Sequence, residues 1–255
     1  MQANTIDEVI LQLEKIIEQS IADQDPMGFF AALYHQVTVT VKDGIRQSYY
    51  QDGPQMEKLD ILFANRYLYA YAQFKNKETC TQSWLYAFDC TRRFWPTVLQ
   101  NLLLGINAHI NLDLGIAAAH TCPGEGIHAL KADFDKINIV LAAMVTDVEK
   151  SLTTIWPRLS WVLEKFGKTD TFLIDFSMKQ ARDGAWKFAT ELARLPPEQQ
   201  LAQIQVRDIK IRKIAHMISK PGFFISSIFM IIRIGEIGTV AKKIETLWKK
   251  RSLDI

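Results

Sequence analysis

The residues best placed for chemistry lie in the most apolar stretch of the chain, Leu102 to His120, which reads LLLGINAHINLDLGIAAAH. On an α-helix, at about 100° per residue, His109, Asp113 and His120 fall within about 40° of one another. A histidine followed four residues later by an aspartate can begin a divalent-metal site, with His120 as a third ligand. The same pair can instead be an internal hydrogen bond in which the aspartate fixes the histidine tautomer. The spacing leaves both interpretations open.

A second polar stripe lies on nearly the opposite side of this helix and contains Gln100, Asn107 and Asn111. Leucine and alanine fill the flanks between the stripes, which indicates a central helix that is touched on all sides. An unsatisfied buried polar group costs about 1–3 kcal/mol, so each stripe must either meet partner side chains or line a wet cavity.

The segment EKLDILFANRYLYAY carries two further candidates, Asp60 and Arg66. Asp60 shares an apolar helix face with Phe63 and Tyr67, so it is either half of a buried salt bridge with an arginine or a carboxylate whose pKa is shifted in a cavity. The predicted catalytic set is His109, Asp113, Asp60 and Arg66. In this set His109 is a metal ligand or general base, the two aspartates are ligands or orienting groups, and Arg66 clamps an anion.

Residues on other helices could line a substrate pocket around this centre. The predicted substrate-binding residues are His35, Tyr67, Asn107, Asn111, Asn138, Arg182 and Trp186. A single histidine such as His35 on an apolar helix is also typical of a hydrogen-bonded core residue. Arg182 could clamp an anion or neutralise an aspartate. The cofactor is not identified by these residues. The one cofactor that the sequence suggests is a divalent metal such as zinc, bound by His109, Asp113 and His120.

Composition narrows the class of protein. The chain has 255 residues, 48% of them hydrophobic, and a net charge of +2, so no global field favours nucleic acid. From Gln205 to the end, eleven Lys and Arg face four Asp and Glu, so this basic segment could contact an anionic membrane or simply face solvent. The three cysteines have no close pairing pattern, which suits a reducing compartment. The N-terminus has no signal-peptide pattern, and GFFISSIFMIIRIG is too short to span a bilayer. We therefore expect a cytoplasmic protein.

Helical periodicity dominates the chain and predicts an all-α fold. We expect a single bundle of about ten helices around a buried central helix, with a C-terminal helical pair. The predicted parts are residues 1–195, the main bundle, and 196–255, the pair packed on it, with LPPEQQ as the boundary. The second helix of the pair is expected from Phe223 to Lys250, and the pair could act as a lid. The β-branched stretch VTVTV could be a short extended piece.

Four segments resemble a family of bacterial helical proteins of unknown function: LDILFANRYLYA, LQNLLLGINAHINLDLGIAAA, DFDKIN and ARDGAWKFATEL. The family's most recognisable run is NAHINLDLG, at Asn107–Gly115. The resemblance covers about Phe29 to Leu195 and leaves the last 60 residues outside. It implies a helical fold and brings no activity.

The pattern His109, Asp113 and His120 is also similar to one in the all-helical zinc-dependent phospholipase C and nuclease class. There, His-x-x-x-Asp and a later histidine bind metal. That class also needs a second His-x-x-x-Glu/Asp pair and a ligating N-terminal tryptophan, which this sequence lacks. The similarity therefore implies one or two metal ions rather than three.

Three functions fit these patterns. The first is an enzyme with a buried polar pocket, performing metal-assisted hydrolysis or acid/base chemistry on an apolar or ester substrate. The alternative is a non-catalytic helical protein that binds a lipid-like or aromatic small molecule. The third is an internal hydrogen-bond network, with function on a partner surface. The expected partners are a partly apolar small molecule and, through the basic C-terminal segment, a membrane surface; nucleic acid is not expected.

Overall fold

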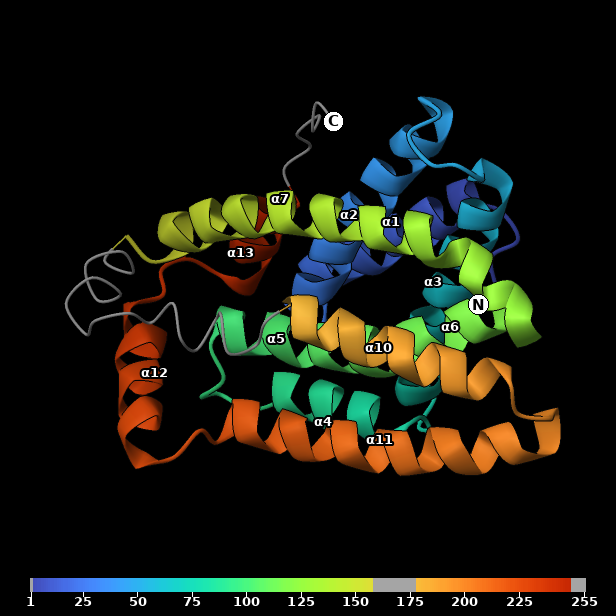
Figure 1. Ribbon diagram of the computed structural model, residues 1–255. Coiled ribbons are helices and arrows are strands. Elements are labelled where there is room, and N and C mark those ends of the chain that lie inside the picture. Colours follow the sequence, from blue (N-terminus) through green and yellow to red (C-terminus); the bar gives the residue numbers. More distant parts are fainter. Residues whose placement is uncertain (1, 158–177, 249–255) are drawn as a thin grey trace.

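The fold is all-α, as the computed structural model in Figure 1 shows; it describes residues 2–157 and 178–248. These ranges contain eleven α-helices and no strand. In chain order the helices are α1 (Ile6–Ala22), α2 (Gly28–Arg46), α3 (Gly53–Lys75), α4 (Gln82–Thr91), α5 (Val98–Ala108), η1 (a π-helix, His109–Asp113), α6 (Leu114–Thr121), η2 (a 3₁₀ helix, Gly124–Leu130), α7 (Lys131–Ile155), α10 (Met178–Ala193), α11 (Pro197–Ser219), α12 (Phe223–Gly235) and α13 (Val240–Leu247). The predicted all-α class is confirmed. The expected helix from Thr154 to Phe166 and the start of the one expected at Asp170 lie mostly outside the described residues.

A central helix runs through the middle of the molecule, formed by α5, η1 and α6 without interruption (Figure 1). Thr97 begins it with a capping box: its hydroxyl accepts the Gln100 N–H, and the Gln100 side chain accepts the Thr97 N–H. Helices α2, α4 and α11 pack against α5, and α3 and α10 pack against α6. The helix is therefore enclosed on all sides, and the predicted buried central helix is confirmed.

The β-branched stretch VTVTV is helical and lies within α2. The hydroxyls of Thr38 and Thr40 donate to the carbonyl oxygens of Tyr34 and Gln36, four residues earlier. These bonds satisfy the hydroxyls inside the core, and burial of the helix outweighs the strand preference of its side chains.

The C-terminal part forms three helices in the described residues, rather than the expected pair. The helix expected from Phe223 to Lys250 is divided into α12 and α13, and the connection includes Gly238 in the left-handed region (φ +86°). Helix α13 packs against α1, α2 and α7. Its Ile244 and Leu247, like Ile211 of α11, belong to the buried core.

Two stretches of the described chain are long and apolar enough to cross a membrane by length and composition. One is the central helix, Val98–Thr121. Its most apolar segment is 94% buried inside the protein, as expected for a core helix. The other is the pair α11 and α12, which is bent by 66° at the break between the two helices.

Candidate functional site

Asp113, at the end of the π-helix η1, is the centre of a buried cluster of polar side chains. Its Oδ1 accepts a hydrogen bond from Arg66 Nε of α3 (2.8 Å). Its Oδ2 accepts from Trp84 Nε1 of α4 (2.7 Å) and lies 3.2 Å from His109 Nδ1. Three donors on three elements therefore fix one fully buried carboxylate. We call His109, Asp113, Arg66 and Trp84 the Asp113 cluster.

The π-helix supplies both His109 and Asp113. In it the Leu114 N–H donates to the carbonyl of His109, five residues earlier, instead of four as in an α-helix. The wider turn leaves the Asn111 carbonyl to accept a hydrogen bond from Arg207 Nε (3.0 Å) of α11. Short π-helices within α-helices occur frequently at functional sites.

The imidazole of His109 lies between two aromatic rings. It is stacked on Phe63 with ring centroids 3.6 Å apart and an interplanar angle of 9°. The Tyr34 ring meets it edge to face, at 4.4 Å. His109 is 2% exposed, and its Nε2 has no hydrogen-bond partner in the protein. One ring nitrogen is therefore fixed by Asp113 and the other is left free in the core.

The pKa shifts define the charges of this cluster. Burial alone would raise the pKa of Asp113, but Arg66 and the hydrogen bonds from His109 and Trp84 lower it on balance. Burial lowers the pKa of His109, with Asp113 opposing this shift. At neutral pH the carboxylate is thus ionised and paired with Arg66, and the imidazole is neutral. Because Asp113 can only accept, His109 carries its proton on Nδ1 and has a lone pair on Nε2.

Asp60 lies on the same face of α3 as Phe63 and is 5% exposed. Its Oδ2 has no hydrogen-bond partner. Burial, and secondarily the charge of Glu57, raises its pKa from 3.8 to about 7. Arg66 pairs with Asp113 instead, and Asp60 forms no salt bridge with an arginine among residues 2–157 and 178–248. Asp60 therefore fits the other interpretation, a buried carboxylate whose pKa is raised.

Aromatic side chains pack around His109, and one of them, Tyr34, is close enough to both Asp60 and Asp113 for their charges to act on it. The rings in mutual contact around His109 are Phe30, Tyr34, Phe63, Tyr67 and Trp84. The hydroxyls of Tyr34 and Tyr67 are buried without a hydrogen-bond partner. Burial raises the pKa of both phenols well above the ordinary value, and the charge of Asp60 adds to this for Tyr34. The site thus combines aromatic packing with several buried polar atoms that have no hydrogen-bond partner.

A family model described as a family of unknown function (DUF5995) matches residues 6–221. The chain belongs to this family. The match reaches α1 and α11, so the extent predicted from sequence, Phe29 to Leu195, was too short at both ends. No curated protein and no solved structure matches the chain, and the similarity to the zinc-dependent phospholipase C class gains no support.

The second polar stripe of the central helix faces α11. Asn107 Nδ2 donates to the carbonyl of Ile211 (3.0 Å), and Asn111 Nδ2 donates to Asn107 Oδ1 (3.0 Å). These two predicted substrate-binding residues therefore tie the central helix to α11. The two stripes face opposite sides, and only the first meets the aromatic side chains around His109.

Of three other predicted substrate-binding residues, two lie away from the Asp113 cluster. His35 of α2 contacts Glu14 of α1, with Nε2 and Oε1 3.2 Å apart, and its ring meets Trp248. Trp186 of α10 packs against Phe134, at 4.9 Å between centroids. The side chain of the third, Asn138, lies outside the described residues.

Arg182 of α10 is buried, and its Nε and one Nη have no hydrogen-bond partner. Burial lowers its pKa to about 10, although Asp183 and Asp135 act in the opposite direction. None of the interactions described connects it to His109, Asp113 or Asp60. The structure therefore does not bring Arg182 into the cluster.

The predicted metal set is not assembled. His120 is exposed at the end of the central helix, where its Nε2 lies 3.0 Å from Gln200 Oε1. Within residues 2–157 and 178–248, no group of three or more His, Cys, Asp or Glu side chains could hold a metal ion. Asp113 uses both oxygens for hydrogen bonds, and the adjacent Arg66 would repel a cation. The donor set does not fit a metal.

Sequence reasoning did not include Tyr34 or Trp84 among the site residues. The indole of Trp84 is the second donor to Asp113, and only the tertiary arrangement of α4 identifies it. A weak signal existed for Tyr34: it follows Phe30 by four residues, so both lie on one helix face.

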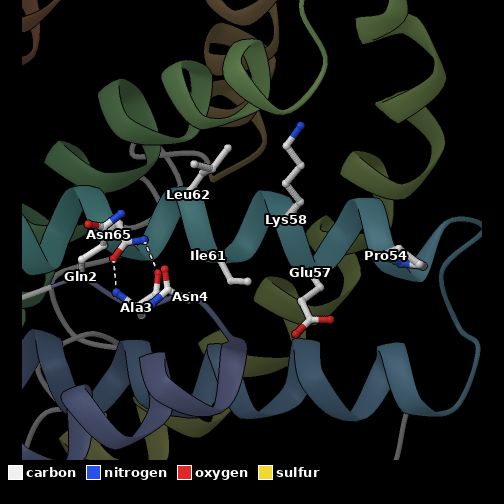
Figure 2. Close-up of a pocket in the computed structure, with 9 residues that line it drawn as sticks. All are labelled: Gln2, Ala3, Asn4, Pro54, Glu57, Lys58, Ile61, Leu62 and Asn65. Carbon is white, nitrogen blue, oxygen red and sulfur yellow. Dashed lines mark hydrogen bonds between the residues drawn. The ribbon is translucent and has the colours of Figure 1, made fainter.

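A separate pocket of about 490 Å³ lies between α3 and the N-terminal residues Gln2, Ala3 and Asn4, as Figure 2 shows. It is lined by Gln2, Ala3, Asn4, Pro54, Glu57, Lys58, Ile61, Leu62 and Asn65. None of these residues belongs to the Asp113 cluster, which lies on the inner side of the helix. Arg66 has a side chain 29% exposed, the largest exposure in that cluster. Arg66 is therefore the member of the cluster that contacts solvent.

Proposed function

We propose that the chain is an enzyme in which His109 acts as a general base on a small, partly apolar substrate. One observation carries the proposal: Nδ1 of His109 is held by Asp113 while Nε2, buried and neutral, has no partner. A purely structural network would be expected to satisfy both nitrogens, because a buried unpaired acceptor costs about 1–3 kcal/mol. A base that must receive a proton needs such a free lone pair.

The surroundings of His109 support this role. Asp113 is held by Arg66 and Trp84, so it can orient the imidazole and stabilise the imidazolium that forms when Nε2 takes a proton. Asp60, with its pKa raised to about 7, acts on Tyr34, whose ring contacts His109, and is the proposed proton donor. A neutral base and a protonated carboxyl group are the pair that acid/base chemistry requires.

Ester hydrolysis is the most concrete reaction for this arrangement. A water molecule would lose a proton to His109 Nε2 while its oxygen attacks the ester carbonyl carbon. The bond to the alcohol oxygen would then break, and that oxygen would take a proton from the imidazolium or from Asp60. The aromatic walls would hold the apolar part of the ester, and no metal is needed for any of these steps.

A non-catalytic binding protein is the second candidate. The unpaired hydroxyls of Tyr34 and Tyr67 favour it, because a bound ligand with polar atoms would satisfy them without any reaction. In that case His109 and Asp60 would be hydrogen-bonding partners of the ligand rather than proton-transfer groups.

A screen of carboxylic esters with aromatic or acyl chains tests the proposal, using the full chain and two matched variants. His109→Gln should lower the hydrolysis rate about 10²–10⁴-fold, because it removes the base. His35→Gln, which replaces another buried histidine outside the cluster, should retain the rate. Nitrogen NMR of the wild type should show His109 unprotonated at Nε2 near neutral pH.

Two outcomes would contradict the proposal that the chain is an enzyme. One is equal hydrolysis by wild type and His109→Gln. The other is a copurified apolar molecule that solvent extraction removes, with no turnover in the screen, which would establish the binding protein instead.

A further inference from the structure

Helix α12 presents an apolar face to solvent. Phe223, Phe224 and Ile234 are 92%, 68% and 77% exposed. We call this the α12 face, which consists of Phe223, Phe224, Met230, Ile231 and Ile234. Soluble monomeric proteins rarely expose a contiguous apolar patch of this kind unless it binds something.

Two polar side chains of α12, Ser227 and Arg233, have hydrogen-bond partners within the protein. The Ser227 hydroxyl donates to the Phe223 carbonyl (2.9 Å). Arg233 Nε donates to the Phe94 carbonyl (2.7 Å), and its Nη1 lies 3.3 Å from Glu236 Oε2. These groups therefore have partners without water, as an apolar environment demands.

The loop between α4 and α5 extends this surface. Phe94 and Trp95 are 68% and 53% exposed, and the Arg233 guanidinium lies 4.8 Å from the centroid of the Phe94 ring. The loop thus lies beside α12. Tryptophan is enriched where protein meets the interface of a lipid bilayer, because its ring is apolar and its N–H polar.

Basic side chains lie at the corner where α11 meets α12. Arg93 and Lys220 are exposed. The Arg93 guanidinium lies 5.7 Å from the centroid of the Tyr86 ring, and the Tyr86 hydroxyl lies 2.6 Å from Oγ of Ser219, the residue before Lys220. Arg93 and Lys220 therefore lie at one corner of the molecule. Lys220 precedes Phe223, the first residue of the α12 face, by three residues. Positive charge beside an exposed apolar face matches the head groups and acyl chains of anionic lipid.

We propose that the α12 face, with Phe94 and Trp95, docks on an anionic lipid surface. The helix lies in the interface rather than across the bilayer, since its 13 residues span about 20 Å against a hydrocarbon core of about 30 Å. Figure 1 shows α12 at one end of the molecule, with α11 on one side and α13 on the other. This inference is independent of the proposed catalysis at His109.

Sedimentation with vesicles tests the proposal. The full chain should partition onto phosphatidylcholine vesicles that contain phosphatidylglycerol, and only weakly onto pure phosphatidylcholine. A Phe223→Ser/Phe224→Ser variant should lose about a hundredfold in partitioning, because it removes two exposed aromatic side chains that would insert among the lipids. Lys220→Glu should weaken binding to the anionic vesicles only. Leu201→Ser, on the far end of α11 and 62% exposed in the wild type, should bind normally.

Circular dichroism of each variant ensures that a loss of binding is not a loss of fold. Equal partitioning of the double serine variant and the wild type would overturn the proposal. The proposal would also be overturned if the wild type did not bind vesicles but formed a dimer through this face. Light scattering would then show a dimeric wild type and a monomeric double serine variant.

Discussion

At the scale of single residues, the site combines two buried groups whose pKa values move in opposite directions. Burial lowers the pKa of His109 and raises that of Asp60 to about 7, so near pH 7 the imidazole is neutral and the carboxyl group is about half protonated. The sequence identified both residues, because their helix faces are apolar. It could not predict that Arg66 pairs with Asp113 rather than Asp60, since that choice depends on how α3 is rotated against the central helix.

Asp60→Asn should make the protein more stable at alkaline pH. The folded-state pKa of about 7 exceeds the unfolded value of 3.8. Between these pH values the unfolded chain releases a proton that the folded chain retains, so wild-type stability falls as pH rises from about 4 to about 7. The full penalty, about 2–4 kcal/mol, is present above pH 7 and absent from the asparagine variant. Urea unfolding at pH 4 and pH 8 measures the difference.

Asp133→Asn is the control with the opposite sign. Asp133 accepts the N–H groups of Gln51 and Asp52 and contacts Lys136, and on balance these partners lower its pKa. Its ionised form stabilises the fold above the unfolded pKa of 3.8, and this contribution is lost as pH falls through the lower folded value. The variant should therefore be less stable at pH 8. If Asp60→Asn behaves in the same way, Asp60 is not a raised, unpaired carboxyl group.

At the scale of elements, the central helix was predictable and its π-turn was not. Apolar content and the Thr97 cap indicate a buried helix. The π-helix from His109 to Asp113 depends on tertiary partners such as Arg207, which takes the freed Asn111 carbonyl. Residues at i and i+4 remain neighbours in either helix type, so the predicted proximity of His109 and Asp113 did not depend on this detail.

Close packing of the central helix against α10 gives a prediction at this scale. A Cβ at Gly115 would lie 2.7 Å from Phe188 Cδ1 and 2.9 Å from the Ala185 carbonyl oxygen. Gly115→Ala should therefore lower the free energy of unfolding by about 1–3 kcal/mol, although alanine favours helix more than glycine does. Thermal and urea unfolding measure this. Gly126→Ala, where nothing lies within 4 Å, should change stability by no more than about 0.5 kcal/mol. Equal effects of the two substitutions would mean that α10 can move away from the central helix.

At the scale of the whole molecule, the C-terminal part supports the start of the central helix. Glu236, between α12 and α13, accepts the Val98 N–H with Oε1 (2.7 Å). Its Oε2 lies 3.1 Å from Lys243 Nζ, and both of these side chains are nearly fully buried. Local sequence patterns predicted that helices follow LPPEQQ. They carried no information about this contact, because Val98 and Glu236 are 138 residues apart.

Glu236→Gln should destabilise the molecule at two distant places. The buried Lys243 would lose the carboxylate it contacts, which costs about 3 kcal/mol when one partner of a buried ion pair is removed. Hydrogen exchange should then accelerate both in α13 and in the first turn of α5, because one side chain holds them together. Glu245→Gln, whose partner Lys242 is exposed, should have an effect within about 0.5 kcal/mol. If only α13 exchanged faster, the C-terminal part would open without disturbing the central helix, as the lid predicted from sequence would do. Joint loss of protection would instead mean that the central helix and the C-terminal part unfold together.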